Sequence, residues 1–218
     1  MHAATGRPTI IFDFDGTIAN TLELVVKIYN RIAPEYGCRT VGDDIRETLR
    51  HGRPQDLMKT FGVTIARLPR FVLRMRKEIG RCMSEVAPVT GMPEAVRELA
   101  AEPFDLGILS SNGVENVEAF LTANGLDRYF GFIRSGIHLF GKDVVLRKLM
   151  RARHIAPDRA MYIGDETRDI EAAKKTGIPV VAVSWGYQAG DVLLAASPDA
   201  LADHPGELVK CIRRIARG

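Results

Sequence analysis

The sequence predicts an α/β protein built on a parallel β-sheet, with a helical segment inserted after the first strand. Short apolar runs suited to buried strands occur at residues 9–14, 104–110, 131–136, 160–164 and 179–185. Segments with helical periodicity, such as 114–125 and 143–154, lie between them, and this alternation is typical of βαβ units. The runs are continuously apolar rather than alternating, as expected for parallel strands covered on both faces.

The segment between residues 20 and 88 breaks this rhythm. It contains no convincing strand, and its apolar residues Val25, Ile28, Tyr29, Ile32 and Tyr36 recur at the three- and four-residue spacing of a helix. It carries 13 basic residues against 8 acidic ones. We therefore predict a core formed by residues 1–19 and 89–218, and an α-helical domain formed by residues 20–88.

Composition narrows the class of protein. The chain of 218 residues is 46% hydrophobic and 26% charged, which is typical of a globular protein. No apolar run approaches the roughly 20 residues that span a bilayer, and the net charge of +3 is too small to indicate nucleic-acid binding. The chain has three cysteines, Cys38, Cys82 and Cys211, which are far apart in the sequence. We expect them to be reduced thiols rather than parts of a disulfide framework. We expect a cytoplasmic monomer or homodimer with neither nucleic-acid nor membrane partners.

Two aspartates, Asp13 and Asp15, follow the first apolar run, and Gly16 comes directly after them. Side chains two residues apart on a strand share a face, so both carboxylates are expected to converge above the sheet edge, where open α/β sheets bind ligands. Gly16 permits an abrupt turn. Two carboxylates this close repel unless a cation intervenes, which predicts Mg²⁺. The alternative is that the aspartates only cap the following helix.

Polar residues also follow two later segments. Ser110, Ser111 and Asn112 end the second strand, where hydroxyl and backbone N–H groups either hold an anion or cap a helix. Lys142 begins a predicted helix, where its charge opposes the helix dipole. A lysine in this unfavourable position indicates a function, although a solvent-facing lysine is the alternative.

The fourth of these polar ends follows the strand at residues 160–164. Asp165 and Glu166 come directly after it, and Asp169 lies four residues after Asp165. That spacing lets Asp165 and Asp169 face each other over one helical turn. One carboxylate could then bind a metal ion, and the other could hydrogen-bond to the residues that hold the metal. Each strand end thus contributes polar groups to one edge of the sheet.

These four motifs resemble, in order and spacing, those of the haloacid dehalogenase superfamily of hydrolases. DFDGT at 13–17 is similar to its first motif, ILSSN at 108–112 to its second, Lys142 of FGKD to its third, and GDETRD at 164–169 to its fourth. The resemblance extends over residues 8–185 and implies a Rossmann-like parallel core. The helical insertion is similar to the α-helical cap of phosphoglycolate phosphatase-like members.

The resemblance implies a Mg²⁺-dependent phosphatase that hydrolyses a small phosphomonoester through an aspartyl-phosphate. Asp13 would be the nucleophile, and Asp15 the general acid and base. The Asp13 carboxylate, the Asp15 main-chain carbonyl and Asp165 would hold the metal. Asp169, and less directly Glu166, would orient Lys142 or the metal ligands. The implied phosphate-binding residues are Gly16, Thr17, Ser110, Ser111, Asn112 and Lys142.

The resemblance leaves the substrate and one residue assignment open. Either Ser110 or Ser111 matches the hydroxyl position of the second motif, and Ser110 is favoured as the last in-line strand residue. The presence of Asp15, which protonates a departing alkoxide, argues against dehalogenation. A phosphoglycolate-like ester or a sugar phosphate is the expected substrate. A phosphomutase of the same superfamily, or a phosphoryl-binding regulatory protein without hydrolysis, is the alternative.

Basic residues of the insertion are candidates for substrate recognition. Arg50 and Arg53 lie in a loop expected to face the site, and the segment 67–81 carries six basic residues and one acidic. Arginine side chains there could bind a second anionic group of the substrate. Arg70, Arg74, Lys77 and Arg81 fall on one helical face, however, which favours a solvated surface. Trp185 and Tyr187 are expected to pack near the last strand.

Overall fold

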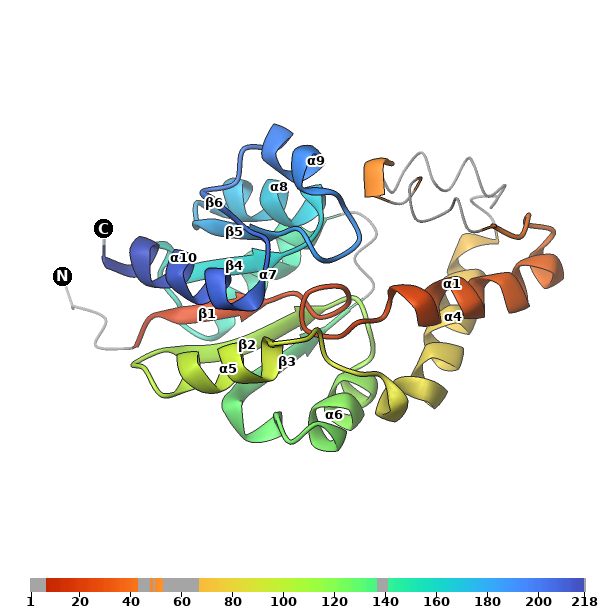
Figure 1. Ribbon diagram of the computed structural model, residues 1–218, viewed down its shortest axis with the longest axis horizontal. Helices are drawn as coiled ribbons and strands as arrows, with labels where there is room; N and C mark the ends of the chain where they lie inside the picture. The colour runs from red at the N-terminus through yellow and green to blue at the C-terminus, as the bar shows by residue number, and fades with distance from the viewer. Residues whose placement is uncertain (1–6, 43–47, 49, 53–66, 137–140, 218) are drawn as a thin grey trace.

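The computed structural model describes residues 7–42, 48, 50–52, 67–136 and 141–217 (Figure 1). Its centre is a six-stranded sheet in the order β3-β2-β1-β4-β5-β6, in which every neighbouring pair is parallel. The strands are β1 (Thr9–Phe12), β2 (Asp105–Ser110), β3 (Phe130–Ser135), β4 (Ala160–Gly164), β5 (Val180–Val183) and β6 (Ala200–Ala202). This parallel α/β sheet confirms the predicted fold class.

Helices cover both faces of the sheet and form its two hydrophobic layers. On one face, α5 (Met92–Ala100), α6 (Val114–Ala123) and α10 (Pro205–Arg217) pack over Ile10 and Phe12. On the other, α7 (Lys142–Ala152), α8 (Thr167–Thr176) and α9 (Gly190–Ala195) pack over Ile11 and Tyr162. Side chains alternate between the faces of a strand, so the continuous run Ile10–Ile11–Phe12 supplies both layers.

The insertion after β1 is helical in the part that the structure describes. It comprises α1 (Leu22–Ile32), the 3₁₀-helix η1 (Ala33–Tyr36), α4 (Leu68–Cys82) and the 3₁₀-helix η2 (Met83–Glu85). Further 3₁₀-helices are η3 (Asp127–Tyr129) and η4 (Pro157–Arg159). In Figure 1, α1 and α4 extend beyond the carboxyl ends of the strands. The insertion is thus placed next to the edge where the polar motifs lie.

Helices α1 and α4 are joined by aromatic contacts and by a buried carboxylate. The rings of Tyr29 on α1 and Phe71 on α4 are 5.8 Å apart in an edge-to-face arrangement. Glu78 of α4 is buried and accepts hydrogen bonds from Arg31 of α1 at 2.5 Å and from Arg81 at 2.8 Å, and Arg74 lies 3.1 Å from it. Part of the basic face of α4 therefore serves to neutralise Glu78.

The structure departs from the predicted strands at several ends and in one additional strand. β5 ends at Val183, two residues before the predicted end. β1 ends at Phe12, two residues before the predicted end, because the chain turns where the aspartates begin. β6 was not predicted, since three residues are too few to show a periodic pattern. None of the helices in the described ranges is both long and apolar enough to cross a membrane.

Candidate active site

The polar motifs meet where the order of the strands reverses. β1 lies between β2 and β4 at the centre of the sheet, and the chain proceeds from β1 to β2 on one side and later to β4 on the other. Open α/β sheets bind ligands at the carboxyl ends of the strands at such a switch point. Asp13 directly follows β1, and Asp165 directly follows β4.

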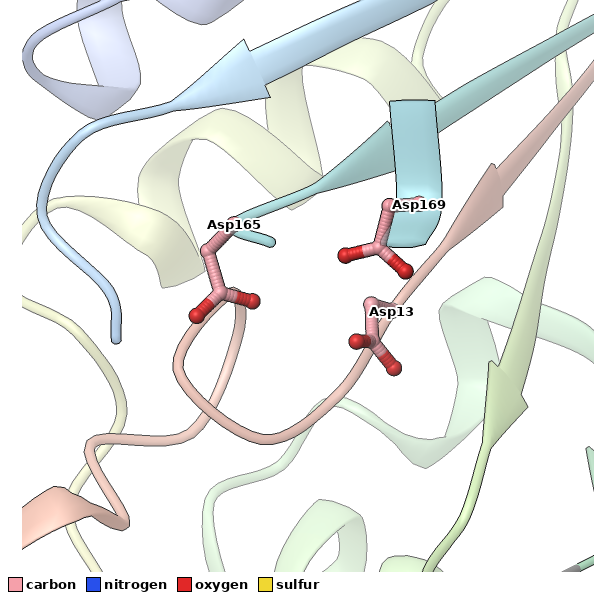
Figure 2. A group of neighbouring side chains, drawn as sticks. All are labelled: Asp13, Asp165 and Asp169. Atoms are coloured by element: carbon pink, nitrogen blue, oxygen red, sulfur yellow. The ribbon is translucent and has the colours of Figure 1, made fainter. Parts of the chain in front are cut away.

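Three buried carboxylates converge at this point: those of Asp13, Asp165 and Asp169. Each offers an oxygen atom within 4.8 Å of the others, and Figure 2 shows them approaching one another from the ends of β1 and β4 and from the first turn of α8. Burial, followed by the charge of Glu166, raises the pKa of Asp165 well above its usual range. Burial also raises the pKa of Asp169 to about 6, although Lys142 opposes this effect. Buried, closely spaced oxygen ligands fit a hard divalent cation such as Mg²⁺.

The carboxylate of Asp165 is fixed by groups from two loops. The hydroxyl of Thr17 donates to its Oδ1 at 2.8 Å, and the backbone N–H of Tyr187 donates to its Oδ2 at 2.7 Å. Gly16 has a φ of +78°, and a Cβ atom at this position would lie 2.9 Å from the Asp165 Cγ. The loop after β1 therefore needs glycine both for its conformation and for its close approach to Asp165.

Gly16 and Thr17, two of the predicted phosphate contacts, form hydrogen bonds within this arrangement. The backbone N–H of Gly16 donates to the carbonyl of Ala19 at 2.9 Å. Thr17 is completely buried, and its hydroxyl is bonded to Asp165. The Thr17 hydroxyl is thus a partner of the acidic group, and its phosphate contact stays a prediction.

Lys142 is the first residue of α7 and is almost completely buried. Its Nζ lies 2.9 Å from the Asp13 Oδ2, donates a hydrogen bond to the Asp169 Oδ1, and lies 5.2 Å from the centre of the Tyr162 ring. Burial lowers its pKa, but the carboxylates of Asp13 and Asp169 raise it more, so the pKa is well above its usual value. The lysine is therefore a charged partner of the acidic group, not a solvent-facing residue.

Asp15 does not share a strand face with Asp13, because the chain has left β1 and the completely buried Phe14 separates the two. The Asn112 Nδ2 lies 3.4 Å from the Asp15 Oδ1, and the Thr21 hydroxyl also hydrogen-bonds to this carboxylate. Burial, followed by the charge of Asp13, raises the pKa of Asp15 to about 6. The two aspartates still interact, but through the turn rather than through a strand pleat.

Thr21 and Tyr187 extend this network and were not predicted as site residues. The Thr21 Oγ1 and the Tyr187 hydroxyl are 3.1 Å apart. Thr21 has one hydroxyl proton, so when it donates to Asp15 the Tyr187 hydroxyl must donate to Thr21. Tyr187 was expected to pack beside the last strand, yet it links Asp15 to Asp165 through its hydroxyl and its backbone. A single aromatic residue in a loop gives no periodic signal of such a position.

Of the predicted anion-binding residues at the end of β2, Asn112 lies close to Asp15. Ser110 is completely buried, and its Oγ accepts a hydrogen bond from the backbone N–H of Asn112 at 2.9 Å. The side-chain oxygen of Asn112 accepts from the N–H of Gly113 at 2.9 Å, which leaves the amide nitrogen facing Asp15. Ser111 is half-buried.

Asp169 and Glu166 form the start of α8. The Asp169 Oδ2 accepts a hydrogen bond from the backbone N–H of Glu166 at 3.0 Å, while its Oδ1 accepts from Lys142. Glu166 is the N-cap residue of a capping box and pairs with Arg168 at 2.7 Å. Asp169 thus reaches the lysine directly, whereas Glu166 binds the helix end and Arg168.

The insertion contacts the core close to this site. The backbone carbonyl of Arg50 accepts from the N–H of Ala189 at 2.9 Å, and the Gln188 side chain donates to the Gly52 carbonyl at 3.1 Å. Arg53, the other predicted substrate residue, lies outside the described residues. Arg76 of α4, one of the basic residues of the segment 67–81, lies 3.3 Å from the Ser135 Oγ at the carboxyl end of β3.

Comparison with known proteins identifies the family of this chain. The chain belongs to the haloacid dehalogenase-like hydrolase family, which it matches over residues 10–183. It is 34% identical over 208 residues to a phosphoglycolate phosphatase of Synechococcus elongatus, a match that covers 95% of this chain and 98% of the relative. It is 25% identical to the pyrophosphatase PpaX of Listeria monocytogenes, covering 96% and 98% of the two chains.

A solved structure supports the fold. A predicted phosphatase from Clostridium acetobutylicum superposes with a TM-score of 0.83 at 21% identity, covering 96% of this chain and all of that one. The sequence-derived resemblance is confirmed, and the chain is an enzyme of the phosphatase type.

Proposed function

We propose that this protein is a Mg²⁺-dependent phosphomonoesterase that acts through an aspartyl-phosphate on Asp13. The observation that carries the proposal is the position of the Asp13 carboxylate, 2.9 Å from the Lys142 Nζ and within 4.8 Å of the oxygens of Asp165 and Asp169. A carboxylate held between a cation and a metal-binding group can attack phosphorus, because the surrounding positive charge offsets its repulsion from the phosphate.

The metal would be held by the carboxylates of Asp13 and Asp165 and by the main-chain carbonyl of Asp15. Bound there, Mg²⁺ would supply positive charge that stabilises the phosphoryl oxygens in the transition state. The hydrogen bonds from Thr17 and Tyr187 to Asp165 would keep this ligand oriented. Asp169 would hold Lys142 beside Asp13 rather than bind substrate.

Asp15 would act as the general acid and then as the general base. It would protonate the departing alkoxide oxygen while Asp13 attacks, and would then remove a proton from the water that hydrolyses the aspartyl-phosphate. Its contacts with Thr21 and Asn112 would aim the carboxylate at the leaving group. Ser110 or Ser111, the neighbouring Asn112 and Lys142 would bind the transferring phosphoryl oxygens.

We also propose that residues 20–88 form a cap over this site and contribute to substrate selection. The contacts of Arg50 and Gly52 with the segment after β5, and of Arg76 with the end of β3, support this placement. The identity to a phosphoglycolate phosphatase along nearly the whole chain favours a small phosphorylated acid as the substrate, with a sugar phosphate next. We further propose that the enzyme acts in the cytoplasm.

Release of inorganic phosphate from a panel of phosphomonoesters tests the proposal. The panel should contain phosphoglycolate, several sugar phosphates and nucleotides, each with Mg²⁺ and with excess chelator. We expect Mg²⁺-dependent release that is lost in Asp13→Asn, a variant of nearly equal volume. Conversion of one sugar phosphate isomer to another without phosphate release would instead identify a phosphomutase.

A further inference from the structure

A cavity lies at the edge of the sheet opposite the acidic group, at the amino ends of β1, β2 and β3. It has a volume of about 580 Å³, within the range of roughly 300–1,000 Å³ typical of small-molecule sites. β2 is six residues long, so at about 3.3 Å per residue roughly 20 Å of strand separates the two edges. This cavity is therefore distinct from the acidic group at the carboxyl ends.

Basic side chains from four separate segments line the cavity. They come from the residue stretch before β1, from η3, from the end of α7 and from η4, and they are Arg7, Arg128, Arg153, His154 and Arg159. The one carboxylate in the lining is that of Asp105. The lining thus contains four guanidinium groups and one carboxylate, a composition that favours an anionic ligand.

Two of these arginines are positioned by aromatic rings. The Arg153 guanidinium lies 4.1 Å from the centre of the Phe132 ring, and that of Arg128 lies 4.9 Å from the centre of the Tyr129 ring. Within the described part of the chain, neither takes part in an ion pair. Arg128 also donates a hydrogen bond from Nη2 to the Tyr129 hydroxyl at 2.9 Å. These contacts orient each guanidinium and leave its other N–H groups available for hydrogen bonds.

His154 adds a strained backbone position at the edge of the cavity. It follows the end of α7 with a φ of +55°, in a place where helices usually have glycine. A non-glycine residue in this left-handed region costs free energy, and here the result is an imidazole beside Arg153 in the cavity lining.

We propose that this cavity is a binding site for a small anion that carries at least two phosphate groups. Several guanidinium groups from different segments suit a ligand with two or more phosphate groups better than a ligand with one. Each guanidinium can bind the oxygens of a separate phosphate group through its paired N–H donors. The aromatic faces of Phe132 and Tyr129 bound the same space. The alternative is a set of solvated arginines near a helix end, which would bind any anion weakly.

Calorimetric titration with methylenediphosphonate, whose phosphorus atoms are joined by a bond that phosphatases do not cleave, tests this inference. The protein should carry Asp13→Asn and be kept in excess chelator, so that the metal-dependent site does not contribute. We expect saturable one-to-one binding. Each of Arg128→Gln and Arg153→Gln should weaken the affinity at least tenfold, because each substitution removes a guanidinium that donates charge-assisted hydrogen bonds to phosphate oxygens.

The double variant Lys148→Gln/Arg151→Gln is the matched control. Both residues lie in α7, the helix that precedes Arg153, but neither lines the cavity, so the variant removes two positive charges nearby without changing the proposed site. We expect its affinity to stay within about threefold of the parent. An equally large weakening in the control would show nonspecific attraction and would overturn the proposal. So would the absence of saturable binding, or binding that is insensitive to both arginine substitutions while each variant keeps the parent melting temperature.

Discussion

Replacement of Lys142 by methionine should strongly destabilise the metal-free protein. Methionine keeps the apolar stem of the side chain but removes the charge that contacts Asp13 and Asp169. Lys142 is only 6% exposed, and both carboxylates are buried, so solvent cannot replace the missing ammonium group. Removing one member of a buried ion pair costs about 3–5 kcal/mol. For a chain of this length, each kcal/mol corresponds to about 2–4 °C of melting temperature.

Chemical denaturation in excess chelator measures this destabilisation, and a double variant supplies the control. Asp169→Asn removes one carboxylate while its amide oxygen can still accept the hydrogen bond from the Glu166 N–H. Lys142→Met/Asp169→Asn should therefore recover at least about half of the decrease in the free energy of unfolding, since fewer uncompensated charges remain buried. A decrease below about 1 kcal/mol in Lys142→Met, or no recovery in the double variant, would refute the reasoning.

Three further predictions concern the loop after β1 and the metal. Gly16→Ala should lower the free energy of unfolding by about 2 kcal/mol or more in denaturation experiments, because of the +78° φ and the overlap with Asp165; an unchanged stability would contradict the described turn. Thr21→Val should slow hydrolysis of alkyl phosphates at least tenfold more than that of p-nitrophenyl phosphate. The reason is that a departing alkoxide needs protonation by Asp15, whereas p-nitrophenolate does not. Equal slowing of both substrates would show that Thr21 has a merely structural role. Mg²⁺ at about 100 times its dissociation constant should add roughly 2.7 kcal/mol of stability, and Asp165→Ala should abolish this gain in a thermal melt; a gain that persists would place the metal elsewhere.

Much of the fold could be predicted from local patterns. The continuously apolar strands and the helices between them indicated an α/β class, because each buried strand carries enough apolar residues to show its type. β6 could not be predicted in this way, as its three residues depend on pairing with β5 rather than on their own sequence.

The candidate site was predictable where a motif names a residue by its position after a strand. Asp13, Lys142, Asp165 and Asp169, which belong to the first, third and fourth motifs, lie close together as the motifs suggested. The contacts that hold them were less accessible, because they join loops far apart in the sequence. Thr17 and Tyr187 are separated in the sequence by the strands β2 to β5, yet both bind the Asp165 carboxylate.

The positions of Asp15 and Glu78 differ from the sequence-based expectation because they, too, depend on contacts between distant segments. Asp15 was placed on a strand face with Asp13 by the two-residue period, but the strand ends one residue before Asp13. Local sequence does not define where the last sheet hydrogen bond forms. Glu78, which gathers arginines from α1 and α4, likewise depends on the packing of two helices that are distant in sequence.

Trapping of a covalent intermediate tests the central claim most directly. The Asp15→Asn variant, mixed with p-nitrophenyl phosphate and Mg²⁺, should still form the aspartyl-phosphate, because this leaving group needs no protonation, but should hydrolyse it slowly. Borohydride reduction followed by peptide mass spectrometry should then find homoserine in place of Asp13. Phosphate release without any modification at Asp13, or reduction at a different carboxylate, would contradict the proposed mechanism.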